Sequence, residues 1–408
     1  MKIAVIGSGI SGLSAAYYLS KKHKVDLFEQ DDHFGGHSYT YDIKEDNKVT
    51  PVDLGFIVFN ELTYPNLIKF FQELDVPFEK SNMSFAVSIK NTNVEYGGSN
   101  FNAIFANKKN LFNIKFLKMI NEIISFYKKA PLLLSQNITD ETLGGYLNKS
   151  KLSNYFIEYH IIPMVAAIWS MPFEKAKDMP FKLFLNFFIN HGLFKLKDRP
   201  QWYTVTNRSR TYVNKILNKI SGEVFKNYQV NKIVRSENNV RVSIGNEYID
   251  YDHVVLASHA DQSLKMIDDP TKEEKEILTK FSYVSNNAYL HLDKNLMPQR
   301  KSAWSSWNSI TKENKTCVTY WLNKLQNLKT EKNYFLTLNP VEKINEENII
   351  KKVKFTHPYF NNENVTLQKD LHSLQGKKRT WFCGSYFGYG FHEDGLKSSM
   401  QLLEKFKN

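Results

Sequence analysis

Cysteine is nearly absent from this sequence. Only Cys317 and Cys383 occur among its 408 residues, and they lie far apart along the chain. Two such distant cysteines form neither a disulfide framework nor a CxxC metal motif, so we expect no metal site. A chain with so little cysteine fits a reducing compartment, and we therefore expect a cytoplasmic protein.

Long apolar runs are also absent. No uncharged apolar segment approaches the ~18 residues that a transmembrane helix needs, and IIPMVAAIW at 161–169 is far too short. The apolar N-terminal stretch runs directly into Lys21-Lys22-His23-Lys24, which does not fit an export signal. With 42% hydrophobic residues, the chain can instead bury more than one core as a soluble enzyme.

Acidic residues are outnumbered, and the formal net charge is +12. Binding to nucleic acid would require a clustered basic patch and a recognisable module. The lysines are instead spread along a chain that is also rich in asparagine and isoleucine. We therefore expect no nucleic-acid partner.

One basic segment, 108–129, reads as an amphipathic helix in which lysines flank large apolar residues. The lysines are Lys108, Lys109, Lys115, Lys118, Lys128 and Lys129, and the apolar residues are Phe112, Phe116, Met119, Ile120, Ile123 and Phe126. Such a helix could lie on an anionic membrane, with the protein peripheral to the inner membrane face. The favoured interpretation is a helix whose apolar stripe faces the core while its lysines are solvated.

The most informative motif is a GxGxxG turn formed by Gly7, Gly9 and Gly12. It follows a short apolar strand that begins at residue 3, and it precedes a helix rich in alanine, serine and leucine. In a dinucleotide site the first glycine permits the tight turn and the second lets the backbone approach a pyrophosphate. The third lets the helix pack closely on the strand.

An acidic residue lies where a dinucleotide site needs one. The segment KVDLFEQ reads as a second strand that ends in Glu29, 22 positions after Gly7. A carboxylate there can accept hydrogen bonds from both hydroxyls of an adenosine ribose and disfavours a 2′-phosphate. We place the following Gln30 in the same site.

A second glycine turn distinguishes FAD from NAD. Gly35-Gly36-His37-Ser38 follows Glu29 closely, and Gly55-Phe56-Ile57 comes at the end of another expected strand. A second glycine turn so near the first indicates that the chain passes the pyrophosphate again, as the binding of an extended FAD requires. These residues favour FAD as the cofactor.

The rest of the pattern predicts an α/β protein with a discontinuous Rossmann-like domain. After residue 80 the chain is helical and aromatic to about 200, including FKLFLNFFINHGLF at 181–194. Strand and helix alternation returns at Trp202, with VFKNYQVNKIVRS as a strand and DHVVLASHA as a buried parallel strand. We expect an FAD-binding domain formed by 1–80, 202–275 and 370–408. The inserted mixed α+β substrate-binding domain, which contains the helical part, comprises 81–201 and 276–369.

Together these motifs resemble one enzyme superfamily over nearly the whole chain. The matching segments are GSGISGLSAAYYL, FEQDDHFGGHSYT, VDLGFIVFNELTYPNL, VVLASHADQSL, WSSWN, TYWLNKLQNL, LTLNP and FCGSYFGYGFHEDGL. They resemble the FAD-dependent amine-oxidase-like superfamily, which includes phytoene desaturases and protoporphyrinogen oxidases. The closer resemblance is to a bacterial branch of predicted NAD/FAD-binding oxidoreductases associated with cyclopropane-fatty-acid synthase-like enzymes, which implies an acyl-lipid substrate.

The resemblance also implies a set of cofactor-binding residues. Those implied for the pyrophosphate and ribose are Gly7, Gly9, Ser11, Gly12, Glu29, Gln30 and Gly36, and those implied for the isoalloxazine are Gly55, Phe56 and Ile57. The adenine and the rest of the flavin would be approached by Val230, Ala257, Gly384 and an Asp394-Gly395-Leu396 turn. The last helix would then direct its N-terminal amides at the flavin pyrimidine.

The chain departs from the superfamily pattern at two places. His37 and Ser38 stand where the superfamily often has an arginine, which leaves phosphate neutralisation to backbone amides and His37. Related sequences tend to have Gly-Gly-Ser after the Trp202 strand, whereas this chain has Asn207-Arg208-Ser209. A different backbone turn is expected there.

Catalytic residues are sought next to the C-terminal flavin motif. His392 and Glu393 could orient a substrate or move a proton, and Tyr389 belongs to an aromatic wall beside them. The alternative is that His392 is a core histidine and Glu393 a charge at a helix N-terminus. Cys383 is interpreted as a buried apolar residue on a strand, so the flavin is expected to be noncovalent.

The predicted function is FAD-dependent oxidation or desaturation of an apolar acyl chain, of a fatty acid or phospholipid, by hydride transfer to flavin N5. An amine oxidase and a non-redox double-bond isomerase remain alternatives. Part of the apolar surface of 160–194 is expected to line a tunnel to the flavin. Its residues are Ile161, Ile162, Met164, Val165, Ile168, Trp169, Phe181, Phe184, Leu185, Phe187 and Phe188.

Overall fold

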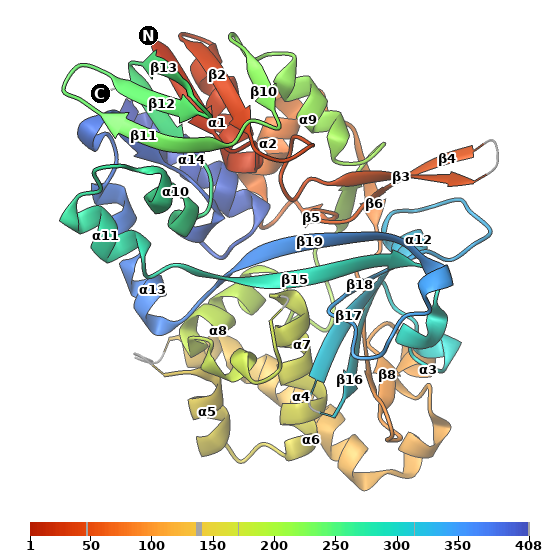
Figure 1. The fold of residues 1–408 in the computed structure, drawn as a ribbon. Coiled ribbons are helices and arrows are strands. Elements are labelled where there is room, and N and C mark those ends of the chain that lie inside the picture. Colours follow the sequence, from red (N-terminus) through yellow and green to blue (C-terminus); the bar gives the residue numbers. More distant parts are fainter. Residues whose placement is uncertain (46–47, 136–140, 170, 314, 407–408) are drawn as a thin grey trace.

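The computed structural model describes residues 1–45, 48–135, 141–169, 171–313 and 315–406 (Figure 1). Its elements form an α/β protein with one parallel sheet and several smaller or mixed sheets. The parallel sheet and its helices occupy one end of the molecule, and a second group of strands and helices occupies the other (Figure 1).

The parallel sheet is assembled from segments far apart in the sequence. Its strand order is β10-β2-β1-β14-β20, and every neighbouring pair is parallel. The strands are β1 (Lys2–Ile6), β2 (Lys24–Glu29), β10 (Val224–Lys226), β14 (His253–Leu256) and β20 (Thr380–Phe382). The apolar residues of β1 and β14 are buried, as a parallel sheet covered on both faces requires.

Helices cover one face of this sheet. They are α1 (Ile10–Ser20), α2 (Pro65–Glu73), α9 (Arg210–Leu217) and α14 (His392–Phe406). The helices α1 and α14 lie in close contact: the hydroxyls of Ser14 and Ser399 are 2.6 Å apart, and a Cβ added at Gly395 would be 2.7 Å from Ser11 Oγ. The sequence therefore brings its first and last helices together over β1.

The other face of the parallel sheet is covered by an antiparallel sheet and two short helices. The sheet consists of β11 (Val230–Arg235), β12 (Val240–Ile244) and β13 (Glu247–Tyr251), and the helices are α10 (Ala260–Met266) and α11 (Lys272–Leu278). The prediction of one strand over VFKNYQVNKIVRS was wrong. Asn227 adopts a φ of 64° between β10 and β11, and this left-handed residue turns the chain from one sheet into the other.

The second half of the molecule is built on a seven-stranded sheet of order β19-β15-β18-β17-β16-β7-β8. Its strands are β7 (Phe85–Ile89), β8 (Glu95–Gly97), β15 (Ser282–His291), β16 (Trp307–Lys312), β17 (Lys315–Trp321), β18 (Phe335–Leu338) and β19 (Ile349–Tyr359). The long strands β15 and β19 run side by side across the middle of the molecule (Figure 1). They therefore border both halves.

Helices from 101–190 pack with this sheet. They are α3 (Phe101–Ile104), α4 (Ile114–Leu134), α5 (Leu143–Lys149), α6 (Asn154–Phe156), α7 (Ile162–Ile168) and α8 (Phe181–Asn190). The favoured interpretation of the lysine-rich segment agrees with α4, because Phe116, Met119, Ile123 and Phe126 are buried in the core. The expected start was wrong: Lys108–Phe112 is a separate 3-10 helix, and Asn113 Oδ1 caps α4 by accepting from the Lys115 and Phe116 amides.

Smaller elements connect the two halves. They are the hairpin of β3 (Thr40–Glu45) and β4 (Lys48–Asp53), the sheet of β5 (Phe59–Asn60), β6 (Phe78–Ser81) and β9 (Trp202–Val205), and the helices α12 (Leu322–Leu325) and α13 (Asn362–Leu367). After β9, Asn207 and Arg208 adopt φ values of 61° and 76°, the conformation that glycine favours. Across the described ranges, no helix is both long and apolar enough to cross a bilayer.

Candidate functional site

A cavity of about 660 Å³ lies at the carboxyl ends of the parallel strands and extends toward β15, β19 and α8. In open parallel sheets this edge is where ligands bind, because the loops that follow the strands meet there. The cavity is lined by the ends of β1, β2 and β14 together with residues from the second half of the molecule. It contains most of the residues that the sequence motifs singled out.

The first glycine loop forms one wall. Gly7 has a φ of 100°, and a Cβ there would lie 2.9 Å from the Ala257 carbonyl oxygen. A Cβ at Gly12 would collide with the Gly7 carbonyl oxygen, so this glycine allows the helix to pack on the turn. A Cβ at Gly9 would meet nothing within 4 Å. The packing of the protein therefore explains Gly7 and Gly12, whereas Gly9 adjoins open space in the cavity.

The start of α1 faces the same space. Gly9 is the N-cap, and no side chain caps the helix. The first amides of a helix lack partners within it and carry a partial positive charge. Because Ile10 and Ser11 line the cavity, this uncapped end is available to an anionic ligand.

Glu29 joins the two glycine loops. Its carboxylate is buried and accepts hydrogen bonds from Ser8 N at 2.9 Å, Ser8 Oγ at 2.5 Å and Asp31 N at 3.0 Å. Ser8 Oγ in turn accepts from Gly35 N at 3.0 Å. A Cβ at Gly36 would be 3.1 Å from Gly9 Cα, so the second glycine turn passes directly beside the first.

The backbone of His37 holds the next segment against this turn. Its carbonyl oxygen accepts from Phe56 N at 2.7 Å, and a Cβ at Gly55 would collide with the same oxygen. Gly55, Phe56 and Ile57 consequently line the cavity. The glycine at 55 is required here by close backbone approach.

The His37 ring has an unusual environment. It makes a backbone hydrogen bond at Thr356, whereas its Nε2 is buried without a partner among the described residues. The ring lies 5.2 Å from Phe355 and 5.0 Å from His357, measured between centroids. Burial, and secondarily the nearby histidines, hold the pKa of His37 well below its ordinary value. The ring is therefore neutral at pH 7.

His392 lines the cavity at the first residue of α14. Its Nε2 is 3.0 Å from Ser38 Oγ and 2.9 Å from Tyr212 OH, and these two hydroxyls also hydrogen-bond each other. The ring stacks on Phe56 with centroids 3.6 Å apart and planes inclined by 11°. Burial lowers the pKa of His392 to about 3. At neutral pH this histidine is uncharged, and it can orient neighbouring groups through its hydrogen bonds.

Glu393 points elsewhere. Its carboxylate accepts from Asn66 N at 3.0 Å, Asn66 Nδ2 at 2.6 Å and Leu67 N at 2.9 Å, and it thereby caps the N-terminus of α2. It is not among the residues that line the cavity. This geometry corresponds to the structural alternative for Glu393, a charge at a helix N-terminus.

The expected Asp394-Gly395-Leu396 turn was wrong, because these residues lie in the first turns of α14. Asp394 Oδ2 accepts from Phe391 N at 2.9 Å, and burial raises the pKa of Asp394 to about 6. Gly395 packs on Ser11, and Leu396 is buried in the core beside α1. The loop before α14, not this segment, borders the cavity.

The remaining predicted residues divide into two groups. Besides those described above, the cavity is lined by Gln30, Val230, Ala257, Gly384 and Tyr389. The predicted residues that do not line it are Gly12, Ser38, Glu393, Asp394, Gly395 and Leu396. Two residues of the second group contact lining residues: Ser38 hydrogen-bonds His392, and Gly12 packs on Gly7.

The end of the cavity remote from Glu29 is apolar and aromatic. Of the eleven residues expected around a tunnel, Ile168, Trp169 and Phe187 line it, and the others belong to the core. Trp307 lines it from β16. The indole nitrogens of Trp169 and Trp307 are buried without hydrogen-bond partners among the described residues.

Charged groups are distributed unevenly around the cavity. Within its described lining, the acidic residues are Glu29, the last residue of β2, and Asp31, two residues later. Among the described lining residues, none at the apolar end presents a carboxylate to a ligand.

The sequence motifs did not identify several lining residues. His259 stacks on Tyr283 with centroids 4.0 Å apart, and His357 enters from β19. His259 lies within the quoted segment VVLASHADQSL, so a signal was present there. His357 is on an edge strand without a motif, and only the pairing of β19 with β15 brings it to the site.

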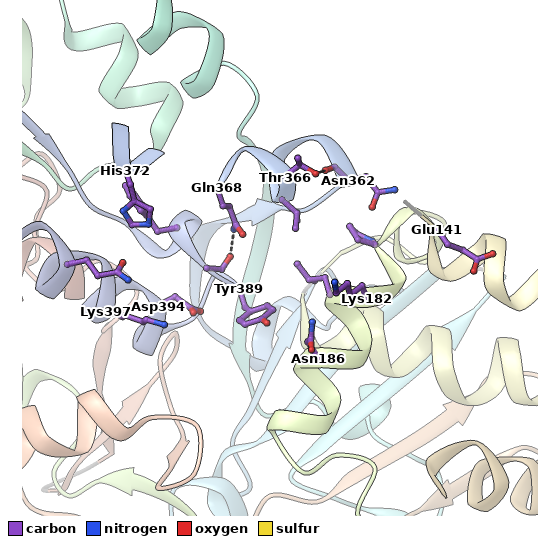
Figure 2. A pocket seen from close by; sticks show the side chains of 16 residues that line it. Glu141, Lys182, Asn186, Asn362, Thr366, Gln368, His372, Tyr389, Asp394 and Lys397 are labelled. Carbon is purple, nitrogen blue, oxygen red and sulfur yellow. Dashed lines mark hydrogen bonds between the residues drawn. The ribbon is translucent and has the colours of Figure 1, made fainter. Parts of the chain in front are cut away.

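A second pocket, of about 540 Å³, lies next to the cavity (Figure 2). Tyr389 borders both, and Figure 2 shows it facing Lys182 and Asn186 of α8. Burial raises the pKa of Tyr389, so its hydroxyl stays protonated. Asp394 lines this second pocket and not the cavity.

Comparisons with known proteins agree with this architecture. Residues 5–74 match the family model of the NAD(P)-binding Rossmann-like domain. No curated protein sequence matches the chain.

Three solved structures cover nearly the whole chain. A fatty acid isomerase from P. acnes that produces CLA has 14% identity and a TM-score of 0.68, covering 99% of this chain and 98% of its own. Putrescine oxidase bound to putrescine has 13% identity and a TM-score of 0.69, covering 100% of both chains. Cyclohexylamine oxidase from Brevibacterium oxydans IH-35A has 13% identity and a TM-score of 0.66, covering 100% of this chain and 99% of its own.

The chain therefore has the fold of these amine oxidases and of the fatty acid isomerase, and its residues 5–74 match the model of a Rossmann-like domain. The fold class expected from the sequence is confirmed. At these identities the likeness concerns the fold, and the acyl substrate is a separate question.

The buried histidines predict that the protein loses stability in acid. Burial lowers the pKa of His160 and His392 to about 3 and that of His191, His291 and His357 to about 4. The unfolded chain takes up these protons near pH 6.5, so their stabilising effect is complete above that pH and is lost as the pH falls. Between its unfolded and its folded pKa, each histidine lowers the free energy of unfolding by about 1.4 kcal/mol for every unit by which the pH falls.

Two buried carboxyls act in the opposite direction. Burial raises the pKa of Asp53 and Asp394 to about 6, so below that pH they favour the folded state, but they are outnumbered by the histidines. The urea concentration at the midpoint of unfolding, followed by tryptophan fluorescence, should fall as the pH is lowered from about 7.5 to about 5. A midpoint constant over this range would contradict the assignment of neutral histidines.

Proposed function

We propose that this protein is an FAD-dependent oxidoreductase that binds its cofactor noncovalently and acts on an apolar acyl chain. The observation that carries the proposal is the single cavity in which two touching glycine loops and a buried glutamate adjoin an apolar, aromatic end. A long dinucleotide with a flavin at one end matches this polarity, since its adenosine and pyrophosphate are polar and its ring system is flat and apolar.

The residues present fit FAD. The open space over Gly9 and the uncapped start of α1 suit the pyrophosphate, and Glu29 retains acceptor capacity for the ribose hydroxyls. Gly55, Phe56 and Ile57 would lie at the isoalloxazine, and the unpartnered Nε2 of His37 would face the phosphates. When bound, FAD supplies a hydride acceptor at N5.

The protein's contribution to the reaction is to bind and align the substrate. Ile168, Trp169 and Phe187 would exclude water and hold an apolar chain against the flavin position. His392 is fixed by Ser38 and Tyr212 and acts as a positioning residue for Phe56, on which it stacks. The hydroxyl of Tyr389 would be a hydrogen-bond donor to a polar head group.

An acyl chain fits the apolar end better than an amine does. A protonated amine in an apolar cavity needs a carboxylate or a comparable partner, because burying an unpaired charge is costly. The acidic residues in the described lining are both at the ribose end. This distribution supports a neutral hydrocarbon substrate over a diamine.

The first test of the cofactor is the variant Gly9→Val. Gly9 has a φ of −63°, and a side chain there meets no protein atom, so the variant should fold but lose FAD because the side chain fills the space of the pyrophosphate. The flavin absorbance at about 450 nm and the release of flavin on denaturation measure the FAD content. Gly98→Val, at an exposed glycine outside the cavity, is the matched control and should keep FAD. A folded Gly9→Val protein with stoichiometric FAD would overturn the proposed binding mode.

The second test concerns His37. The hydrogen bond at Thr356 leaves the Nε2 of His37 as the unpartnered atom, and a neutral Nε2 offers a lone pair that repels a phosphate. FAD binding should therefore take up a proton, and the FAD dissociation constant should rise with pH by up to about tenfold per unit. His357, His259 and His392 are the ionisable neighbours.

Titration of the apoprotein by flavin fluorescence from pH 6 to 9 measures this dependence. His37→Gln cannot take up the proton and should bind FAD more weakly with a flat pH profile. An unchanged slope in His37→Gln would show that another group takes up the proton.

The third test identifies the substrate class. Under anaerobic conditions, unsaturated or methyl-branched acyl lipids should bleach the flavin faster than putrescine or cyclohexylamine. Ile168→Asn, which places a polar group in the cavity, should slow bleaching by about tenfold or more while FAD content is kept, and Ile168→Val should not. Bleaching by amines alone would favour an amine oxidase. Lipid conversion without bleaching or net electron transfer would favour an isomerase.

A further inference from the structure

We propose that an exposed apolar and basic corner of the second half of the molecule docks onto an anionic lipid bilayer. The corner comprises α3, the 3-10 helix Lys108–Phe112 and the start of α4, and we call it the α3–α4 corner. This inference goes beyond the proposed reaction and does not depend on flavin binding.

Large apolar side chains are exposed in the corner. Phe112 is 88% exposed, Ile114 82% and Phe101 64%. Leu111 and Leu117 are also exposed. These five side chains come from one stretch of 17 residues, 101–117, and such a group of exposed apolar residues marks an interaction surface.

The exposed side chains stand on an ordered base. Phe101 packs on Phe105 with ring centroids 4.8 Å apart, and Phe105 packs on the buried Phe116 at 6.0 Å. The side-chain amides of Asn107 and Asn110 both donate to the Asn93 carbonyl oxygen at 3.0 Å. The corner is therefore held to the turn between β7 and β8 and to α4, with its outer residues presented to solvent.

The charge around these residues is of one sign. The sequence has no aspartate or glutamate between Tyr96 and Asn121, and it has Lys108, Lys109, Lys115 and Lys118 there, all exposed. Within the described residues, Lys118 has an acidic neighbour, Glu122, at 3.9 Å, whereas Lys108, Lys109 and Lys115 form no ion pair. An anionic surface complements this arrangement.

Both signals that peripheral membrane binding needs are thus present: apolar side chains that can enter the bilayer interface, and lysines that attract anionic head groups. A stable protein interface usually uses roughly 20–30 residues a side, whereas the corner exposes five large apolar and four basic side chains. The bilayer is therefore favoured over a protein partner.

The structure also revises how the lysine-rich segment would bind. The apolar stripe expected to contact a membrane, which includes Phe116, Met119 and Ile123, is buried in the core. The exposed residues are instead at the start of the segment and on the opposite side of α4. Figure 1 shows α4 at the end of the molecule opposite β1 and β2, so a docked corner leaves the dinucleotide-binding loops away from the bilayer.

Vesicle co-sedimentation of the purified full-length protein tests the proposal. Vesicles of phosphatidylcholine with phosphatidylglycerol should bind the protein, with weaker binding in high salt, and vesicles of phosphatidylcholine alone should bind it at least about tenfold more weakly. The double variant Phe112→Ser with Ile114→Ser should reduce binding by about tenfold or more. Lys108→Glu with Lys109→Glu and Lys115→Glu should do the same.

The matched control is Leu62→Ser with Tyr248→Ser, which removes exposed apolar side chains elsewhere and should leave vesicle binding unchanged. Circular dichroism and flavin content show whether each variant is folded. Vesicle binding that is equal in native protein and both corner variants would overturn the proposal. So would a native protein that ignores vesicles but self-associates in light scattering through the corner.

Discussion

The close contact between the Gly7 turn and α1 is the constraint on which the rest of the site depends. Because Gly12 lacks a side chain, α1 lies directly on the Gly7 carbonyl, and its uncapped N-terminus is fixed at the end of β1. The helix then receives α14 through Gly395 and the paired hydroxyls of Ser14 and Ser399. That contact carries His392 to the cavity at the first residue of α14.

Glu29 extends the same constraint to the second glycine loop. Its carboxylate binds Ser8, Ser8 binds Gly35, and Gly36 lies against Gly9. One buried carboxylate thus sets the separation of two loops from different parts of the sequence. The open space of the cavity lies over Gly9, beside this network.

The cavity is lined by buried, neutral histidines as well as by the exposed Lys265 and Lys354. His37, His259, His357 and His392 all line the cavity, and burial lowers the pKa of each. An arginine at position 37 would carry its charge whether or not a ligand is bound, whereas a histidine acquires charge only when an anion stabilises it. The departure from the superfamily pattern at this position therefore has a physical consequence for ligand binding.

The sequence by itself determined the Rossmann-like part of the protein. Glycine spacing, an acidic residue after the second strand and apolar strands are local signals, and the structure places Gly7, Gly9, Glu29, Gly36 and Gly55 around one cavity. The parallel strand at 253–256 and the apolar face of α4 were also predictable, because burial leaves a pattern in adjacent residues. The domain boundaries and the roles of individual site residues stay predictions.

Only the tertiary structure decided which side chains meet at the apolar end and which point away. Glu393 is adjacent to His392 in sequence, yet it caps α2, because successive helical residues project in different directions. His357 reaches the site through the pairing of β19 with β15, a contact between residues more than sixty positions apart. Phe112 and Ile114 remain exposed while Phe116 is buried, because the start of α4 extends beyond the core that covers the rest of the helix. Such outcomes depend on long-range packing, and no local pattern contains them.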